Sequence, residues 1–274
     1  MASSGCEGFQ VSESAIQIER KGAVAWVWLN RPDVHNAFDA ALIAELTAAY
    51  NDLAQQADVR AIVLAGRGKS FSAGADAQWM KQQGAASVED NASDARKLAD
   101  LFHAIASCPK PTLARVHGAA IGGGVGLTGV CDIAIGSGTA IFAMSEVRLG
   151  LIPATIAPYV VRAIGERHAR RLFQTAERID GATAQRIGLL HEAVPVEELD
   201  ARIGAVLDAI LAGAPEAQNA AKALVANVAG QPINAELREE TARLIALLRG
   251  KPEAAEGLSA FLEKRPASWV PRGS

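Results

Sequence analysis

Two stretches of small residues and one acidic side chain are the groups in this sequence best suited to chemistry. Residues 71–76 read FSAGAD, and residues 122–124 are three consecutive glycines. Small residues let a ligand approach the main chain closely, and the N–H groups that begin a helix point outward with partial positive charge. Two such N–H groups aimed at one point form an oxyanion hole. The predicted chemistry is stabilisation of a carbonyl oxygen that becomes negative, as when a thioester is converted into an enolate.

Glu146 is the acidic group that could act beside these turns. It lies within AIFAMSEVRLGLIP, residues 140–153, where apolar residues flank it on both sides. Such a carboxyl is either a surface acid at the edge of a strand or an acid inside a pocket, and the sequence leaves both possibilities open. In a pocket, the apolar surroundings would raise its pKa and let it carry a proton near neutral pH.

The glycine stretch also matches a nucleotide-binding pattern, which its surroundings exclude. Residues 124–129 fit the dinucleotide fingerprint G-x-G-x-x-G, with Glu146 about 20 residues further on. The next strand pattern follows so closely that a helix there has only about two turns, whereas a crossover to a parallel strand needs about a dozen residues or more. Gly68-Lys69-Ser70 is not a Walker loop, because Val63 stands where its first glycine is required. Tight packing of a short helix against a strand remains an alternative role for the glycines.

The order of elements predicts an α/β core followed by a helical region. Asp39 and Asp76 are expected to cap helices. From about residue 197 to 264 the pattern is amphipathic and helical, with breaks where Gly and Pro cluster. Apolar residues at helical spacing predict helices over 37–56 and 87–106, and apolar runs predict strands over 15–19, 23–29, 60–66, 112–118, 132–138 and 140–146.

Length and composition narrow the classes of function. The 274 residues are half hydrophobic and carry a net charge of -3, which allows a large core and gives no nucleic-acid footprint. No apolar run reaches the roughly 18 residues of a membrane span, and no signal peptide opens the chain. Cys6, Cys108 and Cys131 lack paired spacing and the histidines lack metal-ligand spacing, so we expect no disulfide framework, no metal site and a cytoplasmic protein. Residues 270–274, VPRGS, resemble the remnant of a protease site added for expression.

Several short motifs occur along the chain: Asn30-Arg31-Pro32, Asn36-Ala37, residues 71–76, residues 117–124, Cys131-Asp132, Ser145-Glu146 and residues 150–153. Together they resemble the crotonase (enoyl-CoA hydratase/isomerase) superfamily. The resemblance spans about residues 11–269 in the family's order and spacing. It implies an α/β fold built as a spiral of ββα units, with a C-terminal helical region that forms homotrimers, often paired into hexamers. It divides the chain into a flexible N-terminus (1–10), a core holding the CoA site and active site (11–196) and an oligomerisation region (197–269).

The same resemblance implies roles for individual residues. A coenzyme A thioester is the expected substrate, with no permanently bound cofactor. The N–H groups of Ala75 and Gly123 correspond to the oxyanion donors, and Glu146 to the second of two glutamates that the family's hydratases use. Lys264 matches a position that often reaches CoA on a neighbouring subunit, and for Trp79 and Met80 core packing is an equal alternative to the acyl pocket. The residues expected to bind CoA are His35, Asn36, Ala37, Ala73, Ala75 and Lys264; those expected in the acyl pocket are Trp79, Met80, Gly126 and Arg148.

The chain departs from the family pattern at Gly126, where the first glutamate should stand. Two activities remain open: a hydratase that works with Glu146 alone, or an isomerase that shifts a double bond with one acid/base. Residues 145–167 resemble bacterial methylglutaconyl-CoA and carboxygeranoyl-CoA hydratases, which favours a hydratase for a branched, carboxylated enoyl-CoA. Arg148 or Arg162 would then bind the distal carboxylate, although a surface ion pair is the commoner role for a single arginine. A non-catalytic acyl-CoA-binding protein is the third possibility.

Overall fold

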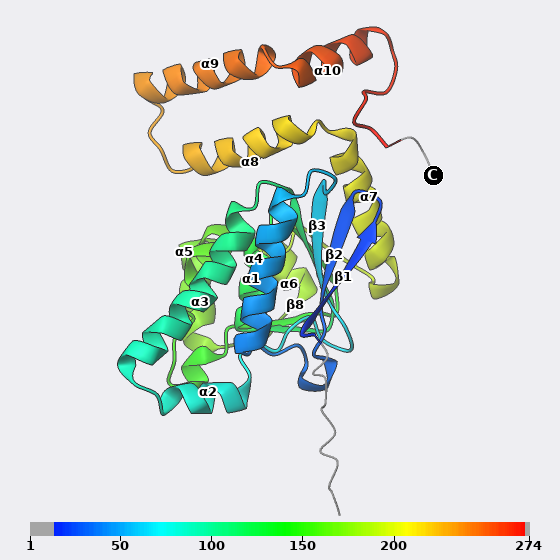
Figure 1. Cartoon of the computed structure of the whole chain (residues 1–274). Helices are drawn as coiled ribbons and strands as arrows, with labels where there is room; N and C mark the ends of the chain where they lie inside the picture. The colour runs from blue at the N-terminus through cyan, green and yellow to red at the C-terminus, as the bar shows by residue number, and fades with distance from the viewer. Residues whose placement is uncertain (1–13, 272–274) are drawn as a thin grey trace, which may run out of the picture.

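Six strands form the larger of two sheets around which the chain is organised (Figure 1). The structure, a computed structural model, describes residues 14–271, so the predicted flexible N-terminus, Cys6 and residues 272–274 lie outside it. The strand order is β1-β2-β3-β4-β6-β9; β1 runs antiparallel to β2 and the other neighbouring pairs are parallel. The strands are β1 (Ile16–Lys21), β2 (Val24–Leu29), β3 (Ala61–Gly66), β4 (Thr112–Val116), β6 (Ile133–Ser137) and β9 (Glu192–Val194).

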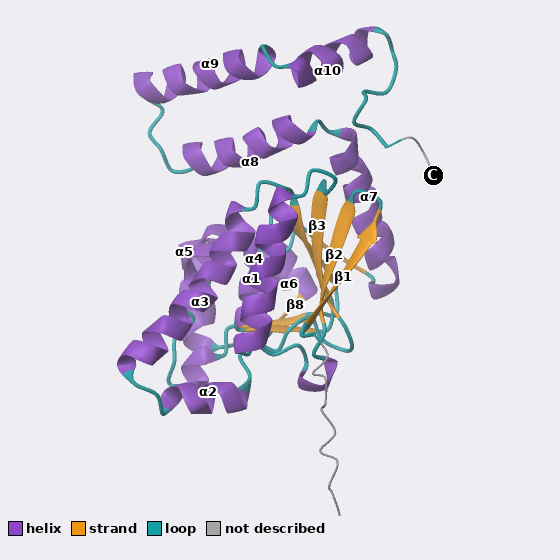
Figure 2. Ribbon diagram, viewed as in Figure 1, coloured by secondary structure: helices purple, strands orange, loops and turns teal. Residues whose placement is uncertain are grey.

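The apolar runs of the sequence are continuous because both faces of the central strands are buried. All six residues of β3 are buried. Ile62 and Leu64 pack on the side of helices α1 (Ala40–Gln55) and α3 (Val88–Ser107), while Val63 packs against α7 (Leu199–Ala212) on the other side. Figure 2 shows the sheet between these helices. Parallel strands covered on both faces lack the alternation of polar and apolar residues, which is the pattern of residues 60–66.

The helix boundaries agree with the capping predictions. The side chain of Asp39 accepts a hydrogen bond from the first turn of α1, and that of Asp76 accepts two from the first turn of α2 (Ala77–Gly84). Helix α4 (Gly123–Val130) has only eight residues before β6, the roughly two turns that the sequence predicts for it. The remaining core helices are α5 (Ala157–Thr175) and α6 (Gly181–Arg186).

Among the regions that differ from the prediction, two lie near Glu146 in the chain. Residues 140–146 form a strand only over β7 (Ile141–Ala143), after which the chain turns into a short 3-10 helix, η2 (Glu146–Leu149). Helix α5 had no predicted counterpart. Gly165, at a φ of 75°, interrupts its helical backbone, so no single apolar face runs through it.

A second, three-stranded sheet connects the two stretches of small residues. Its order is β5 (Ala119–Ile121), β7 and β8 (Ile179–Asp180). Ser72 pairs with Ala120 of β5, and Phe38 pairs with Ala75, each as a single parallel bridge. The segment 71–76 is therefore held between residues 35–38 on one side and β5 on the other.

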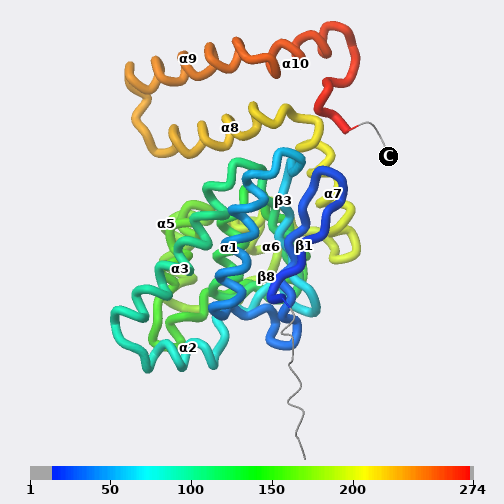
Figure 3. Tube along the Cα trace, in the orientation of Figure 1, coloured from blue at the N-terminus to red at the C-terminus, as the bar shows by residue number. Residues whose placement is uncertain are grey.

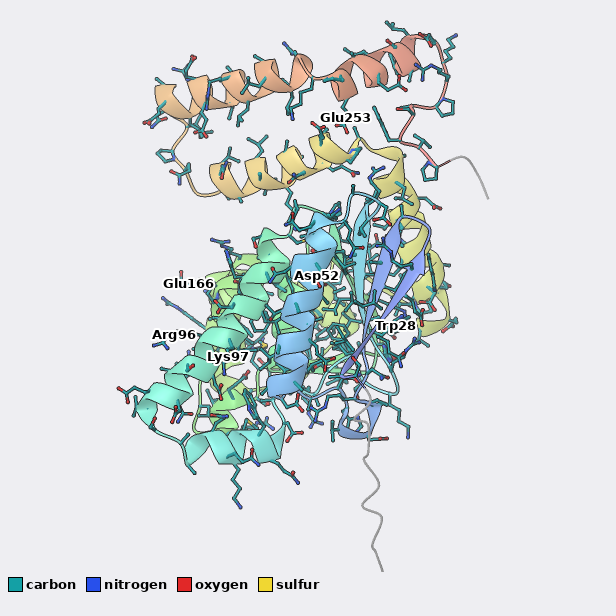
Figure 4. All side chains as sticks on the ribbon, in the orientation of Figure 1. Trp28, Asp52, Arg96, Lys97, Glu166 and Glu253 are labelled. Carbon is teal, nitrogen blue, oxygen red and sulfur yellow. The ribbon has the colours of Figure 1, made fainter. Side chains whose placement is uncertain are left out.

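The last three helices form a C-terminal arm, defined as α8 (Pro215–Val228), α9 (Ala235–Arg249) and α10 (Pro252–Leu262). Figures 1 and 3 show this arm lying away from the sheets. The three helices of the arm, together with α7, confirm the predicted helical character of residues 197–264. No residue of α8 or α9 is buried in the described chain, and only Ala260 of α10 is. A polar contact joins the arm to the core, since Lys222 Nζ of α8 lies 2.7 Å from Asp132 Oδ2. Within the arm, Glu253 of α10, labelled in Figure 4, accepts hydrogen bonds from the first N–H groups of α8.

Asn36 is a fully buried polar side chain that holds the loops near the second sheet together. Its φ of 56° is left-handed, which asparagine tolerates better than most residues. Its amide nitrogen donates to the carbonyl oxygens of Arg67, Ser70 and Phe71, and its Oδ1 accepts from the N–H of Arg31 at 2.9 Å. Asn36 therefore fixes the segment that leads into residues 71–76.

We expect Asn36→Asp to lower the free energy of unfolding by about 3 kcal/mol or more, because a buried carboxylate would face three carbonyl oxygens without a donor. The same substitution at Asn51, which is exposed on α1, should cost less than about 1 kcal/mol. Urea unfolding measures both values. Equal stability of the two variants would show that the hydrogen bonds of Asn36 do not hold the loops.

Candidate active site

One cavity brings together the residues that the sequence analysis singled out for chemistry. Its volume is about 270 Å³, and Ala75, Gly123 and Glu146 all line it. Most of its other lining residues are apolar, and α2, α3, β5, η2 and the segment between η2 and α5 each contribute to them. These are Phe38, Ala73, Gly74, Met80, Leu98, Ile121, Gly122, Ser145, Leu149, Leu151, Ile152, Pro153, Thr155 and Ile156.

The first turn presents the N–H group of Ala75. Gly74, at a φ of 84°, accepts a hydrogen bond from the N–H of Phe38 at 2.6 Å, and the N–H of Asp76 donates back to the carbonyl of Phe38 at 2.8 Å. The N–H of Ala73 donates to the carbonyl of His35 at 2.9 Å. Within the described chain, the N–H of Ala75 has no hydrogen-bond acceptor. It is therefore free for a ligand.

The second turn presents the N–H group of Gly123, at the start of α4. Gly122 donates its own N–H to the carbonyl of Ala143 at 2.8 Å, and its carbonyl accepts from Val125 and Gly126. The N–H of Gly123 has no acceptor among residues 14–271. The two turns are in contact, because a Cβ placed on Gly74 would lie 2.7 Å from the carbonyl oxygen of Ile121 and 3.5 Å from the nitrogen of Gly123. Two free N–H groups therefore belong to neighbouring turns on one cavity.

Glu146 is the acid of this cavity. It is half-buried and begins η2, so the structure favours the pocket position over a strand edge. A Cβ on Gly122 would lie 2.9 Å from Glu146 Oε1, which places the carboxylate against the second turn. Its Oε2 is buried and has no hydrogen-bond partner in the described part of the chain. Burial raises the pKa of this carboxyl above its ordinary value, because the charged form loses hydration.

Gly126 lies one turn further along α4 and has no room for a side chain. A Cβ there would lie 2.3 Å from Ile156 Cγ2 and 2.9 Å from Phe102 Cε1. Ile156 lines the cavity, whereas Gly126 itself does not. The position where the family pattern has its first glutamate is therefore closed by apolar side chains.

Of the other residues predicted for the acyl pocket, one lines the cavity and the rest lie outside it. Met80 lines the cavity together with Leu98 of α3. Trp79 packs against the core and lines a separate groove between α1 and α3. Arg148 is exposed and lies outside the cavity lining. Arg162 on α5 is also exposed.

The residues predicted to bind CoA are also only partly brought together. Ala73 lines the cavity, and the exposed His35 lies nearby with its Nδ1 3.0 Å from Ser70 Oγ. Asn36 and Ala37 are buried, so they can act on a ligand only through the loops they hold. Lys264 follows α10 on the C-terminal arm, and Figure 1 shows α10 at the opposite end of the molecule from α2. One chain alone does not bring Lys264 to the cavity.

His117, which directly precedes the glycine stretch, has a structural role in this fold. Its Nε2 donates to the carbonyl of Gly68 at 2.9 Å, and Arg115 lies 3.2 Å from its Nδ1. Burial lowers the pKa of this imidazole, so the neutral form is favoured. His117 is not among the cavity-lining residues.

Sequence reasoning missed most of the apolar wall of the cavity. Leu149, Leu151 and Ile152 line it although all three are exposed to solvent at more than half of their surface. A run of apolar residues next to a candidate acid was the available signal. Neither a cluster of three or more metal-ligating side chains nor a helix long and apolar enough to cross a membrane occurs among the residues described.

Comparisons with known proteins identify the family. The family model described as enoyl-CoA hydratase/isomerase matches residues 19–272. An enoyl-CoA hydratase structure from Shewanella pealeana shares 40% identity and a TM-score of 0.90, covering 93% of this chain and 96% of that chain. One from Mycobacterium smegmatis shares 33% identity and a TM-score of 0.88, covering 94% and 100%. Enoyl-CoA hydratase AKT6-1 of Alternaria alternata is 38% identical over 208 residues, which are 76% of this chain and 67% of that protein. The chain therefore belongs to the enoyl-CoA hydratase/isomerase family of enzymes, the crotonase superfamily that its motifs resemble.

Proposed function

We propose that this protein is an enoyl-CoA hydratase, which adds water across the 2,3 double bond of an enoyl-CoA thioester. The observation that carries the proposal is an acid with an unpartnered, buried oxygen, set beside two turns whose N–H groups lack acceptors in the described chain. The relatives named as hydratases support this choice of reaction. The proposed substrate is a coenzyme A thioester, which brings its own CoA to the site.

In the proposed reaction, the N–H groups of Ala75 and Gly123 donate to the thioester carbonyl oxygen. The carboxylate of Glu146 takes a proton from water as the water oxygen forms a bond to C3. The π electrons of the double bond then move toward the thioester, and the two N–H groups stabilise the resulting enolate oxygen. Protonated Glu146 returns a proton to C2, so that H and OH are added in total and the carboxylate is restored.

A branched, carboxylated substrate would need a cation at the acyl end of the cavity. The two arginines that the sequence offered for this role, Arg148 and Arg162, are exposed, and neither lines the cavity. Glu146 is the one charged side chain among the lining residues that the structure describes. A distal carboxylate would therefore have to extend beyond this cavity, and the proposed substrate is an enoyl-CoA with an uncharged acyl chain.

A second candidate, an enoyl-CoA isomerase, is favoured by the closed space beside Gly126. Because Ile156 and Phe102 fill that space, a single acid must perform every proton transfer. An isomerase needs only this: Glu146 would remove a proton from C2 of a 3-enoyl thioester and return it at C4. The products separate the two activities, since hydration incorporates oxygen from ¹⁸O-labelled water and migration of the double bond does not.

We further propose that the C-terminal arm, with the rest of residues 197–269, forms a homotrimer or a hexamer. Apolar side chains on its helices are exposed in the single chain, including Phe261 at 80% and Leu262 at 78%. Such surface is usually covered by a partner. In that assembly Lys264 would reach the CoA of a neighbouring subunit, which is consistent with its distance from the cavity of its own chain.

We expect Glu146→Gln to lower kcat for hydration of crotonyl-CoA by about 10²–10⁴-fold, because glutamine can neither take up nor deliver the proton. The affinity for a saturated acyl-CoA should be unchanged. Glu166→Gln is the matched control, since Glu166 is exposed on α5 and paired with Arg170 (Figure 4). Full activity of the Glu146 variant would refute the proposed mechanism, and tight CoA binding without turnover by the wild type would favour a binding protein.

The raised pKa of Glu146 predicts two pH dependences. kcat/KM should rise with pH through a midpoint above about 4.3, the ordinary carboxyl value, because the carboxylate is the base. Because the pKa of Glu146 is higher in the folded state than in the unfolded state, protonation of this carboxyl stabilises the fold. This contribution to the free energy of unfolding is present at low pH and is lost as pH rises through the raised pKa. The melting temperature of the Glu146→Gln variant minus that of the wild type should therefore increase from pH 4 to neutral pH. Parallel curves for the two proteins would contradict this.

We expect Phe261→Asp to reduce the mass measured by light scattering from a multiple of 28.6 kDa to that of one chain. A charge on the exposed apolar face would be buried without a partner in the assembly, while the single chain would tolerate it. Val88→Asp, at a residue 82% exposed outside the arm, is the control and should leave the mass unchanged. An unaltered mass in the Phe261 variant would exclude this face as the interface.

A further inference from the structure

Ile156 and Glu146 both line the cavity, at positions set by α4. Gly122 is the N-cap of this helix, and its carbonyl oxygen accepts a hydrogen bond from the N–H of Gly126 at 3.2 Å, so one turn separates the two glycines. Glu146 lies against Gly122, and Ile156 lies against Gly126. Both Glu146 and Ile156 line the cavity. The acid and the isoleucine therefore share one cavity and lie against two glycines that are one helical turn apart.

The wall at Ile156 has little freedom to move. Ile156 is 2% exposed and precedes the first residue of α5, where its carbonyl accepts hydrogen bonds from Tyr159 and Val160 at 3.1 and 3.0 Å. Its β-branched side chain has few accessible rotamers. Behind it, Phe102 is fully buried and packs against the ring of Tyr159, with ring centroids 5.8 Å apart. A bulky substrate group cannot displace this wall without disturbing the core.

Gly126 allows Ile156 to occupy its position. The 2.3 Å that would separate a Cβ at residue 126 from Ile156 Cγ2 is far below a normal contact, so even alanine at 126 would push Ile156 toward the cavity. Glycine at 126 and isoleucine at 156 therefore form one steric pair. The pair places an apolar, β-branched residue in the lining of the cavity that holds the acid.

We infer that Ile156 is a specificity-determining residue, which limits the size of the substituents on the substrate carbons that Glu146 serves. The inference rests on the proposed function, because hydration brings C2 and C3 within reach of Glu146 and therefore next to Ile156. Its consequence is a preference for thioesters with an unbranched C3 over those that carry a methyl branch there, in place of the branched substrate that the resemblance of residues 145–167 favours.

The test compares crotonyl-CoA with 3-methylcrotonyl-CoA in the wild type and in Ile156→Ala. The wild type should prefer the unbranched substrate. The variant should raise the ratio of kcat/KM for branched over unbranched substrate by at least about tenfold, mainly through KM, since one methyl group in a pocket is worth about 10–200-fold. Ile156→Val, a milder change that protects the fold, should move the ratio in the same direction by less.

Ile203→Ala is the matched control, because Ile203 is fully buried on α7, on the other face of the large sheet. It should lose stability without changing the ratio. An unchanged ratio in both Ile156 variants, or a wild type that prefers the branched substrate, would overturn the inference.

Binding measurements separate this inference from the proposed function. Calorimetry with butyryl-CoA and isovaleryl-CoA, which are saturated and cannot be hydrated, should show the same relaxation of selectivity in Ile156→Ala. If the wild type hydrates no enoyl-CoA but the binding ratio shifts, the hydratase proposal fails and the role of Ile156 stands. If hydration occurs and neither ratio shifts, the role of Ile156 fails and the hydratase proposal stands.

Discussion

The short parallel backbone pairing on both sides of residues 71–76 is the constraint on which the site depends. On one side, Ala73, Gly74 and Asp76 exchange hydrogen bonds with residues 35–38. On the other side, the N–H of Ser72 donates to Ala119 at 3.0 Å, and the carbonyl of Ser72 accepts from Ile121 at 2.9 Å. A segment bonded along both edges cannot rotate its peptides freely. The N–H of Ala75 is therefore oriented before a substrate arrives, which is what makes an oxyanion hole effective.

This close pairing also explains the glycine stretch. A Cβ on Gly124 would lie 2.5 Å from the carbonyl oxygen of Ser72, and one on Gly123 would lie 2.5 Å from the ring of Phe38. The glycines thus permit tight packing, which was the alternative left open by the sequence. That packing is the same contact that brings the two turns to one cavity, so the packing role and the proposed oxyanion role support each other.

The parts of the site set by local sequence were predictable, and those set by distant packing were not. Asp39 and Asp76 cap helices because a capping side chain acts within one turn of its own position. The surroundings of Glu146 depend on Gly122 and on side chains from α2, α3 and α5, which no local pattern shows. The same holds for Asn36, whose four hydrogen bonds reach residues as far as 35 positions away. Family resemblance supplied Ala75, Gly123 and Glu146, but it could not show that Arg148 lies outside the cavity lining.

The proposed hydratase mechanism requires apolar surroundings to do for Glu146 what a second carboxylate at position 126 would do. A hydratase acid must be ionised to accept a proton from water and protonated to deliver one, so its pKa has to lie nearer neutrality than that of a free carboxyl. Two neighbouring carboxylates achieve this by repulsion between like charges, whereas a single carboxyl achieves it by losing hydration. Burial is the largest influence on the pKa of Glu146 and raises it, and Ile156, which occupies the space beside Gly126, is one of the apolar residues that line the same cavity. The glycine that leaves no place for one acid therefore makes room for an apolar residue in the cavity that holds the other.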